Sequence, residues 1–126
     1  MAIGGSGGTK ITSGILQVIL NKFKFGMSNT DAVQFNRIHH QLSPNVLRYQ
    51  SKLLRQFDFF GKSFLAGSAD DTEWIQLISD LNTKRGHELG DPIGNATPVI
   101  QSIYILPDGT IEAVSDYRHQ GVPDGH

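Results

Sequence analysis

The feature that most constrains this chain is the glycine-rich run Gly4–Lys10, which leads without a break into the apolar stretch Ile11–Phe23. Glycine has no Cβ, so it adopts positive φ and allows other groups to approach the backbone closely. We therefore expect neither helix nor an ordinary strand across this run. A turn that leads directly into a helix leaves several backbone N–H groups unpaired and pointing one way. Such a cluster suits a negatively charged group.

Three ligands fit a turn of this kind: a phosphate, a carboxylate, or the oxyanion of an acyl-transfer intermediate. A flexible Gly/Ser leader is the structural alternative. The phosphate-loop pattern G-x-x-x-x-G-K-[ST] is not matched, because Thr9-Lys10 reverses the order and the glycine spacing differs. The nearby hydroxyls, those of Ser6, Thr9, Thr12 and Ser13, lack a G-x-S-x-G elbow, and no base for them is evident beyond Lys10.

Composition limits the class of protein. A length of 126 residues predicts one domain or a piece of one, and 11 basic against 12 acidic residues give no excess that would attract nucleic acid. The absence of cysteine excludes disulfides, thiolate zinc sites and cysteine nucleophiles. The longest apolar run, Ile15–Leu20, is too short to span a bilayer, and the N-terminus lacks the pattern of a signal peptide.

The hydrophobic pattern predicts three helices. Apolar residues at helical spacing over 11–23 predict a helix buried on most sides and ended by Gly26. Ser28 to Asp31 reads as the start of a second, short helix. Acidic residues from Asp70 open a third helix, with a stripe that includes Trp74 and Ile78 and an end at Gly86.

Strands are expected at Val46–Tyr49 and Val99–Leu106. The second is apolar on both alternating sets, so we expect it to be buried on both faces. Pro107-Asp108-Gly109 predicts a hairpin turn to a partner strand at Thr110–Ser115. Residues 51–68 are expected to form a loop with a short helix or strand. The result is an α+β fold whose sheet needs a partner layer.

Two sets of polar residues stand out. His39 and His40 are neighbours in extended chain and point to opposite faces, so we expect packing and hydrogen-bonding roles and neither a metal nor a cofactor. Asp116 and Arg118 are expected to form an ion pair that holds the C-terminal turn, and Arg37 is expected in an ion pair as well.

Four segments, in order, resemble the γ-glutamyltransferase (glutathione hydrolase) family over most of the chain, apart from about 51–95. The family motifs G-S-P-G-G-S-R-I-T, F-G-M-S…E-A-V, P-R-F-H-H-Q…L-P…L-R-V-E and S-D-P-R…G correspond in turn to Gly4–Thr12, Phe25–Val33, Asn36–Tyr49 and Ser115–Gly121. Two departures are Ser6, where the family has Pro or Ala, and Tyr117, where Pro is common.

The resemblance implies that residues 1–126 are the C-terminal portion of a small subunit. The implied fold is part of the Ntn-hydrolase αββα four-layer sandwich. The implied reaction is γ-glutamyl transfer and glutathione hydrolysis, with water, an amino acid or a dipeptide as acceptor. The partners would be the remainder of the small subunit and the large subunit. The location would be extracellular or at the cell surface.

By the same resemblance, Gly7 and Gly8 match the glycines whose N–H groups form the oxyanion hole. Arg37, Asp116 and Arg118 match positions expected to serve structure or maturation. The nucleophilic Thr and the groups that hold the substrate are expected upstream, so this chain alone should be inactive. An inactive remnant, a binding or scaffold domain, and a cephalosporin acylase-type amidohydrolase are the alternatives.

Overall fold

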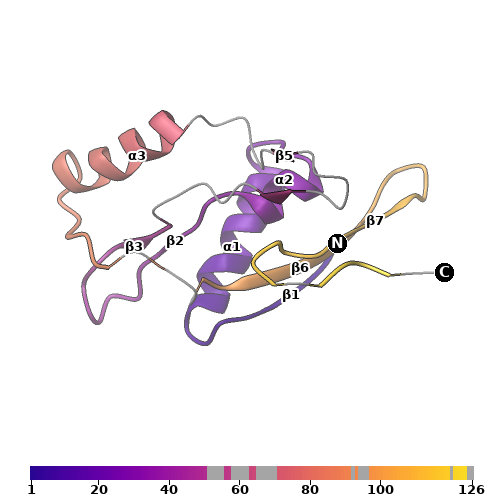
Figure 1. Cartoon of the computed structure of the whole chain (residues 1–126), viewed down its shortest axis with the longest axis horizontal. Helices are drawn as coiled ribbons and strands as arrows, with labels where there is room; N and C mark the ends of the chain where they lie inside the picture. The colour runs from indigo at the N-terminus through magenta and orange to yellow at the C-terminus, as the bar shows by residue number, and fades with distance from the viewer. Residues whose placement is uncertain are drawn as a thin grey trace.

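The computed structural model describes residues 1–50, 56–57, 63–64, 71–91, 93, 97–119 and 121–124. Figure 1 shows the order of the elements along the chain. The helices and strands are β1 (Ala2–Ser6), α1 (Lys10–Phe23), α2 (Asn29–Gln34), β2 (Ile38–His39), β3 (Arg48–Tyr49), β4 (Gln56–Phe57), β5 (Ser63–Phe64), α3 (Asp71–Thr83), β6 (Val99–Ile105) and β7 (Ile111–Val114).

The main sheet has the strand order β1-β6-β7, and both pairs are antiparallel. Its first strand corrects the expectation that the glycine run excludes an ordinary strand, because Gly4 pairs with Gln101 and Gly5 with Ile100. The reason is close packing. A Cβ on Gly5 would lie 2.5 Å from the Val99 carbonyl oxygen, so only glycine fits in this pairing. Partner geometry, and not intrinsic strand propensity, determines β1.

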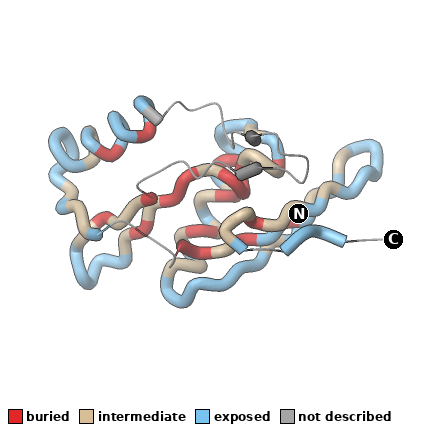
Figure 2. The backbone as a smooth tube through the Cα atoms, in the orientation of Figure 1, coloured by how far each residue is buried: buried red, intermediate tan, exposed pale blue. Residues whose placement is uncertain are grey.

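Helices α1 and α2 cover one face of this sheet (Figure 2). The buried cluster between these helices and the sheet consists of Val18, Ala32, Val33 and Ile100. The expectation that α1 is buried on most sides is confirmed in part: one stripe exposes Leu16, Leu20 and Phe23, and the rest of the helix is buried or partly buried. Among the described elements, α2, β2 and the sheet strands β1 and β6 contact this helix, so a single stripe faces outward.

The predicted helix boundaries agree with the backbone geometry. Gly26 has φ 69°, and the Phe25 N–H bonds to the Leu20 carbonyl at 3.1 Å as α1 ends. The Ser28 side chain caps α2 by accepting from the Asp31 N–H at 3.0 Å. Gly86, with φ 73°, follows α3.

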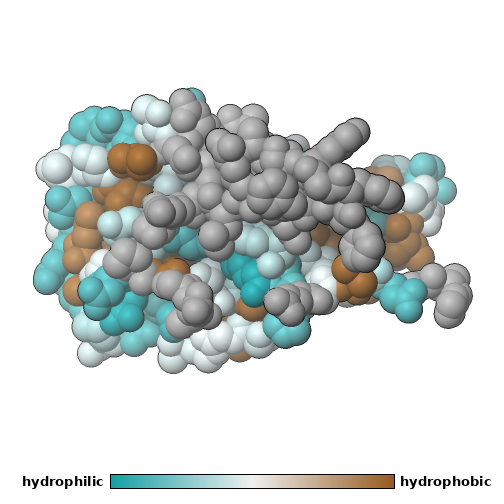
Figure 3. Space-filling view, viewed as in Figure 1, coloured by the Kyte–Doolittle hydropathy of each residue, from teal (hydrophilic) through white to brown (hydrophobic). Residues whose placement is uncertain are grey.

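The second face of the sheet is open, which corrects the expectation that Val99–Leu106 is buried on both faces. Ile103 is 46% and Ile105 59% exposed, whereas Ile100 on the opposite face is fully buried. Figure 3 shows hydrophobic surface at the end of the molecule where β7 lies. Apolar residues on both faces of β6 require two packing layers, and the described residues supply one.

The remaining described elements lie beside this unit. The Trp74 indole N–H donates to the Gln50 carbonyl at 2.8 Å and links α3 to the segment after β3. Leu47 and Leu89 form a parallel bridge. Strand β3 confirms part of the expected strand Val46–Tyr49, while most of the expected loop at 51–68 lies outside the described residues.

Candidate active-site turn

The glycine turn between β1 and α1 has a backbone that only glycine adopts readily. Gly7 has φ 130° and Gly8 has φ 63°. A Cβ on Gly7 would lie 2.9 Å from the Pro98 Cα atom. The Gly7 and Gly8 carbonyls accept from the N–H groups of Lys10 and Ile11 at 3.3 and 3.1 Å, which starts the helix.

Both glycines are exposed. In the described part of the chain, neither of their own N–H groups donates to a backbone carbonyl. Two N–H groups that have no backbone acceptor among the described residues, at the start of a 14-residue helix, are suited to hydrogen-bond a negative oxygen. No acidic side chain occupies the first turn of α1 to compete for this role.

The three charged residues that the sequence singled out lie together in the interior. Arg37 Nη1 is 2.7 Å from Asp116 Oδ2, and Arg118 Nη1 is 2.9 Å from Asp116 Oδ1. Asp116 has no exposed surface. Both predicted ion pairs are therefore present, and they share one carboxylate.

The cluster also satisfies backbone groups from several segments. Asp116 Oδ2 accepts from the Ile100 N–H at 2.9 Å, which connects it to β6. Arg37 donates to the carbonyls of Val33 and Pro98, and Pro98 is the residue that contacts Gly7. Burial lowers the pKa of Arg37 to about 10, with the Arg118 charge as the second cause and Asp116 opposing both. Arg37 therefore remains a cation at neutral pH.

Gln50 joins this cluster, although no sequence pattern pointed to it. Its Oε1 atom accepts from the Arg37 backbone N–H at 2.9 Å and from Arg118 Nη2 at 2.7 Å. No sequence motif marks a glutamine that follows a short strand as a buried hydrogen-bonding residue. Its role follows from its position beside two buried guanidinium groups.

A second hydrogen-bonded chain begins next to the glycine turn. Thr9 Oγ1 donates to Gln41 Oε1 at 3.0 Å, and that oxygen lies 3.0 Å from His39 Nε2. His39 Nδ1 lies 2.8 Å from Ser13 Oγ. The neighbouring His40 has a different partner: its Nε2 atom lies 3.0 Å from Asn45 Oδ1. The adjacent histidines thus have separate hydrogen-bonding partners, and no group of three metal-ligating side chains occurs among the residues described here.

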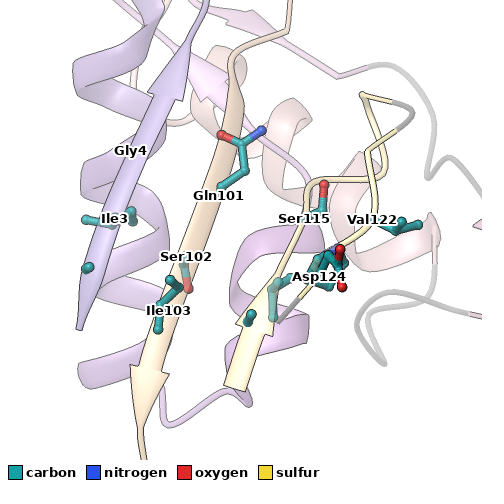
Figure 4. A pocket seen from close by; sticks show the side chains of 12 residues that line it. Ile3, Gly4, Gln101, Ser102, Ile103, Ser115, Val122 and Asp124 are labelled. Carbon is teal, nitrogen blue, oxygen red and sulfur yellow. The ribbon is translucent and has the colours of Figure 1, made fainter. Parts of the chain in front are cut away.

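Two hollows adjoin these residues. A polar cavity of about 200 Å³ lies beside the start of α1, and its lining residues are Thr9, Lys10, His39, Gln41, Pro44, Val46 and Arg48. A larger, mainly apolar hollow of about 420 Å³ lies on the open side of the sheet. Figure 4 shows residues from β1, β6 and the C-terminal segment around it, including Gly4, Ile103 and Val122.

A sheet covered by two helices, with a glycine turn at the start of the first helix, places this chain among mixed α+β folds. The family model of gamma-glutamyltranspeptidase matches residues 1–125. The chain belongs to the gamma-glutamyltranspeptidase family.

Individual relatives agree with this assignment. The chain is 37% identical to glutathione hydrolase 3 of Arabidopsis thaliana and 31% identical to glutathione hydrolase proenzyme 1 of Schizosaccharomyces pombe, in each case over 97% of its length. It spans 21% and 16% of those two proteins. The gamma-glutamyltranspeptidase structure from Pseudomonas nitroreducens matches 98% of the chain with a TM-score of 0.70 and 26% identity, and the chain covers 54% of that structure.

These matches support the α+β fold as a fragment of gamma-glutamyltranspeptidase chains. Within the described residues, no helix has the length and apolar character needed to cross a bilayer.

Proposed function

We propose that residues 1–126 form the C-terminal portion of the small subunit of a γ-glutamyltransferase. In this proposal the full protein is an Ntn-hydrolase that transfers γ-glutamyl groups and hydrolyses glutathione. The family match over 1–125 is the observation that carries the proposal. The open face of the sheet supports it, since an αββα sandwich needs a second sheet there.

In the proposed mechanism, a Thr hydroxyl from the preceding part of the protein attacks the γ-glutamyl amide carbon. The carbonyl oxygen then becomes an oxyanion, and the Gly7 and Gly8 N–H groups donate to it. The C–N bond breaks, and the amine departs with a proton. Water or the amine of an amino acid or dipeptide next attacks the ester and releases the Thr. Fixed donors stabilise the charge that develops in both tetrahedral states.

We assign a structural role, with a contribution to maturation, to Arg37, Asp116 and Arg118. Arg37 donates to the carbonyl of Pro98, the residue against which Gly7 packs, so the buried cluster supports the oxyanion turn from behind. The proposed partners are the remainder of the small subunit and the large subunit. The proposed location is extracellular or at the cell surface, and no cofactor is part of the proposal.

The decisive experiment compares two glycine substitutions in the longer protein that contains this segment. Gly8 and Gly26 lie just outside opposite ends of α1, with φ of 63° and 69°, and a Cβ at either position meets no atom within 4 Å. Gly8→Ala and Gly26→Ala therefore carry similar backbone strain. We expect Gly8→Ala to lower kcat for release of p-nitroaniline from a γ-glutamyl anilide by about 100-fold, because the donors move.

Gly26→Ala should leave kcat close to that of the wild type, although both variants lose similar stability. Equal kcat values for the two variants would contradict the oxyanion role. The 126-residue chain alone should release no p-nitroaniline, and measurable turnover by the purified chain would overturn the assignment of the nucleophile to another segment. A longer protein that cleaves a cephalosporin side chain but no γ-glutamyl anilide would instead indicate the related acylases.

A further inference from the structure

The polar cavity beside the glycine turn, described above, has an unbalanced charge. Lys10 and Arg48 are the charged residues of its lining, and no acidic residue lines it. Within the described part of the chain, neither side chain forms an ion pair. Arg37 and Arg118, in contrast, share the carboxylate of Asp116. Two cationic residues in the lining of one small cavity, with no carboxylate paired to them among the described residues, favour a negatively charged ligand.

The neutral polar side chains that line the cavity, Thr9, His39 and Gln41, already form hydrogen bonds with one another. Gln41 Nε2 donates to the Ser43 carbonyl at 2.9 Å, which sets the direction of the amide. Its Oε1 atom accepts from Thr9 and lies against His39 Nε2. These contacts fix the wall of the cavity and leave the two cations as the groups available to a ligand.

Strand pairing and side-chain packing restrain Arg48 beside this cavity. It pairs with His39 in the β2–β3 ladder. Its aliphatic stem packs against Gly90, where an added Cβ would lie 3.3 Å from Arg48 Cγ. A guanidinium group with a restrained stem loses less rotamer freedom on binding, and its planar donors match a carboxylate.

The position of the cavity narrows the ligand further. Thr9 and Lys10 follow directly after Gly8, so an anion bound here lies beside the oxyanion turn. An extended dipeptide spans at most about 7 Å. Its carboxylate can therefore occupy the cavity while its amine reaches toward the turn.

We propose that Lys10 and Arg48 bind the α-carboxylate of the amino acid or dipeptide that accepts the γ-glutamyl group. This inference rests on the proposed function and adds an acceptor subsite to it. The acceptor amine then approaches the acyl group from the side of Thr9, while the glycine N–H groups hold the oxyanion.

The test uses the longer protein with Arg48→Gln and, as a matched control, Arg85→Gln, which replaces an exposed arginine just after α3. The measured quantity is the ratio of transfer to hydrolysis with glycylglycine as acceptor. We expect Arg48→Gln to lower this ratio by about 10- to 100-fold, as for loss of a charge-assisted hydrogen bond. Arg85→Gln should not change it, and Arg48→Lys should recover part of it.

Glycylglycinamide, which lacks the carboxylate, provides the second arm. With this acceptor, Arg48→Gln and the wild type should give the same ratio. Equal losses with both acceptors, or a loss of stability alone, would overturn the proposal and indicate that Arg48 pairs with an acidic side chain from the remainder of the protein. If the wild type shows neither transfer nor hydrolysis, the proposed function itself fails.

A binding measurement on the 126-residue chain is independent of activity. Glycylglycine should shift the amide resonances of Thr9, Lys10 and Arg48, and glycylglycinamide should not. Inorganic phosphate that shifts them while glycylglycine does not would overturn the assignment to a carboxylate.

Discussion

Asp116 lies between two guanidinium groups and has no contact with solvent. Removal of its charge would leave two cations in the interior without a counter-charge. Buried ion pairs add little net stability when formed, but the loss of one partner is expensive. Asp116 should therefore contribute more to the stability of the fold than is usual for a residue in an irregular C-terminal segment.

We expect Asp116→Asn to lower the free energy of unfolding by about 3–5 kcal/mol. The matched control is Asp80→Asn, which breaks the solvent-facing pair of Asp80 on α3 with Lys84 just after it. That change should cost far less than Asp116→Asn, because solvent screens the pair. Urea unfolding of the three proteins measures both values, and similar midpoints for Asp116→Asn and Asp80→Asn would contradict the role of the buried cluster.

At the scale of elements, the contact of α1 with the sheet depends on a glycine inside the helix. Gly14 is buried, and a Cβ there would lie 3.0 Å from Pro98 Cγ and 3.2 Å from Ile100 Cδ1. Helix propensity alone predicts that alanine would be better by about 1 kcal/mol. The packing argument predicts the reverse, because the helix would have to move away from β6.

Gly14→Ala should therefore destabilise the protein by up to about 2 kcal/mol, the cost of overpacking less the gain in propensity. Thr12→Ala, at an exposed position two residues earlier, should leave stability unchanged or raise it slightly. Thermal unfolding of the two variants separates these effects. A stabilising Gly14→Ala would show that the spacing of α1 and β6 can relax.

The sequence predicted those elements whose signals are local. Periodicity, the Ser28 cap and Gly26 were sufficient for α1 and α2, and the Pro107-Asp108-Gly109 turn was sufficient for the β6–β7 hairpin. Strand β1 was missed because its glycines have low strand propensity and depend on pairing with β6.

The same distinction applies to the site. The positive φ of Gly7 and Gly8 and the ion pairs of Asp116 were expected from the residues themselves. The contact of Gly7 with Pro98 and the chain from Thr9 through Gln41 to His39 bring together residues far apart in sequence. No single-sequence pattern encodes those contacts, so the cavity with Lys10 and Arg48 could not be predicted.

At the scale of the whole molecule, the sheet is covered on one side. Ile103, Ile105 and Ile111 are exposed on the other side. An open apolar sheet face favours association. We therefore expect the purified 126-residue chain to elute from gel filtration above its 13.8 kDa monomer mass.

Ile103→Lys should shift this chain toward the monomer, because a charge at the centre of the open face resists burial. Ile75→Lys, at an exposed position on α3, is the control and should leave the elution volume unchanged. Under the proposed αββα arrangement, the same Ile103→Lys should be destabilising in the longer protein, since a second sheet would bury it. A monomeric wild-type chain, or no effect of Ile103→Lys, would contradict this account of the face.

The ion pair between Arg37 and Asp116 also has a consequence for synthesis on the ribosome. The two residues are separated by 79 positions, so Arg37 emerges long before its counter-charge. At about 5–20 residues per second, that interval is roughly 4–16 seconds. For most of this time α1 and α2 exist without β6, and for all of it without the carboxylate, so a chaperone has time to bind them. The final folding step therefore waits for translation of the C-terminal segment.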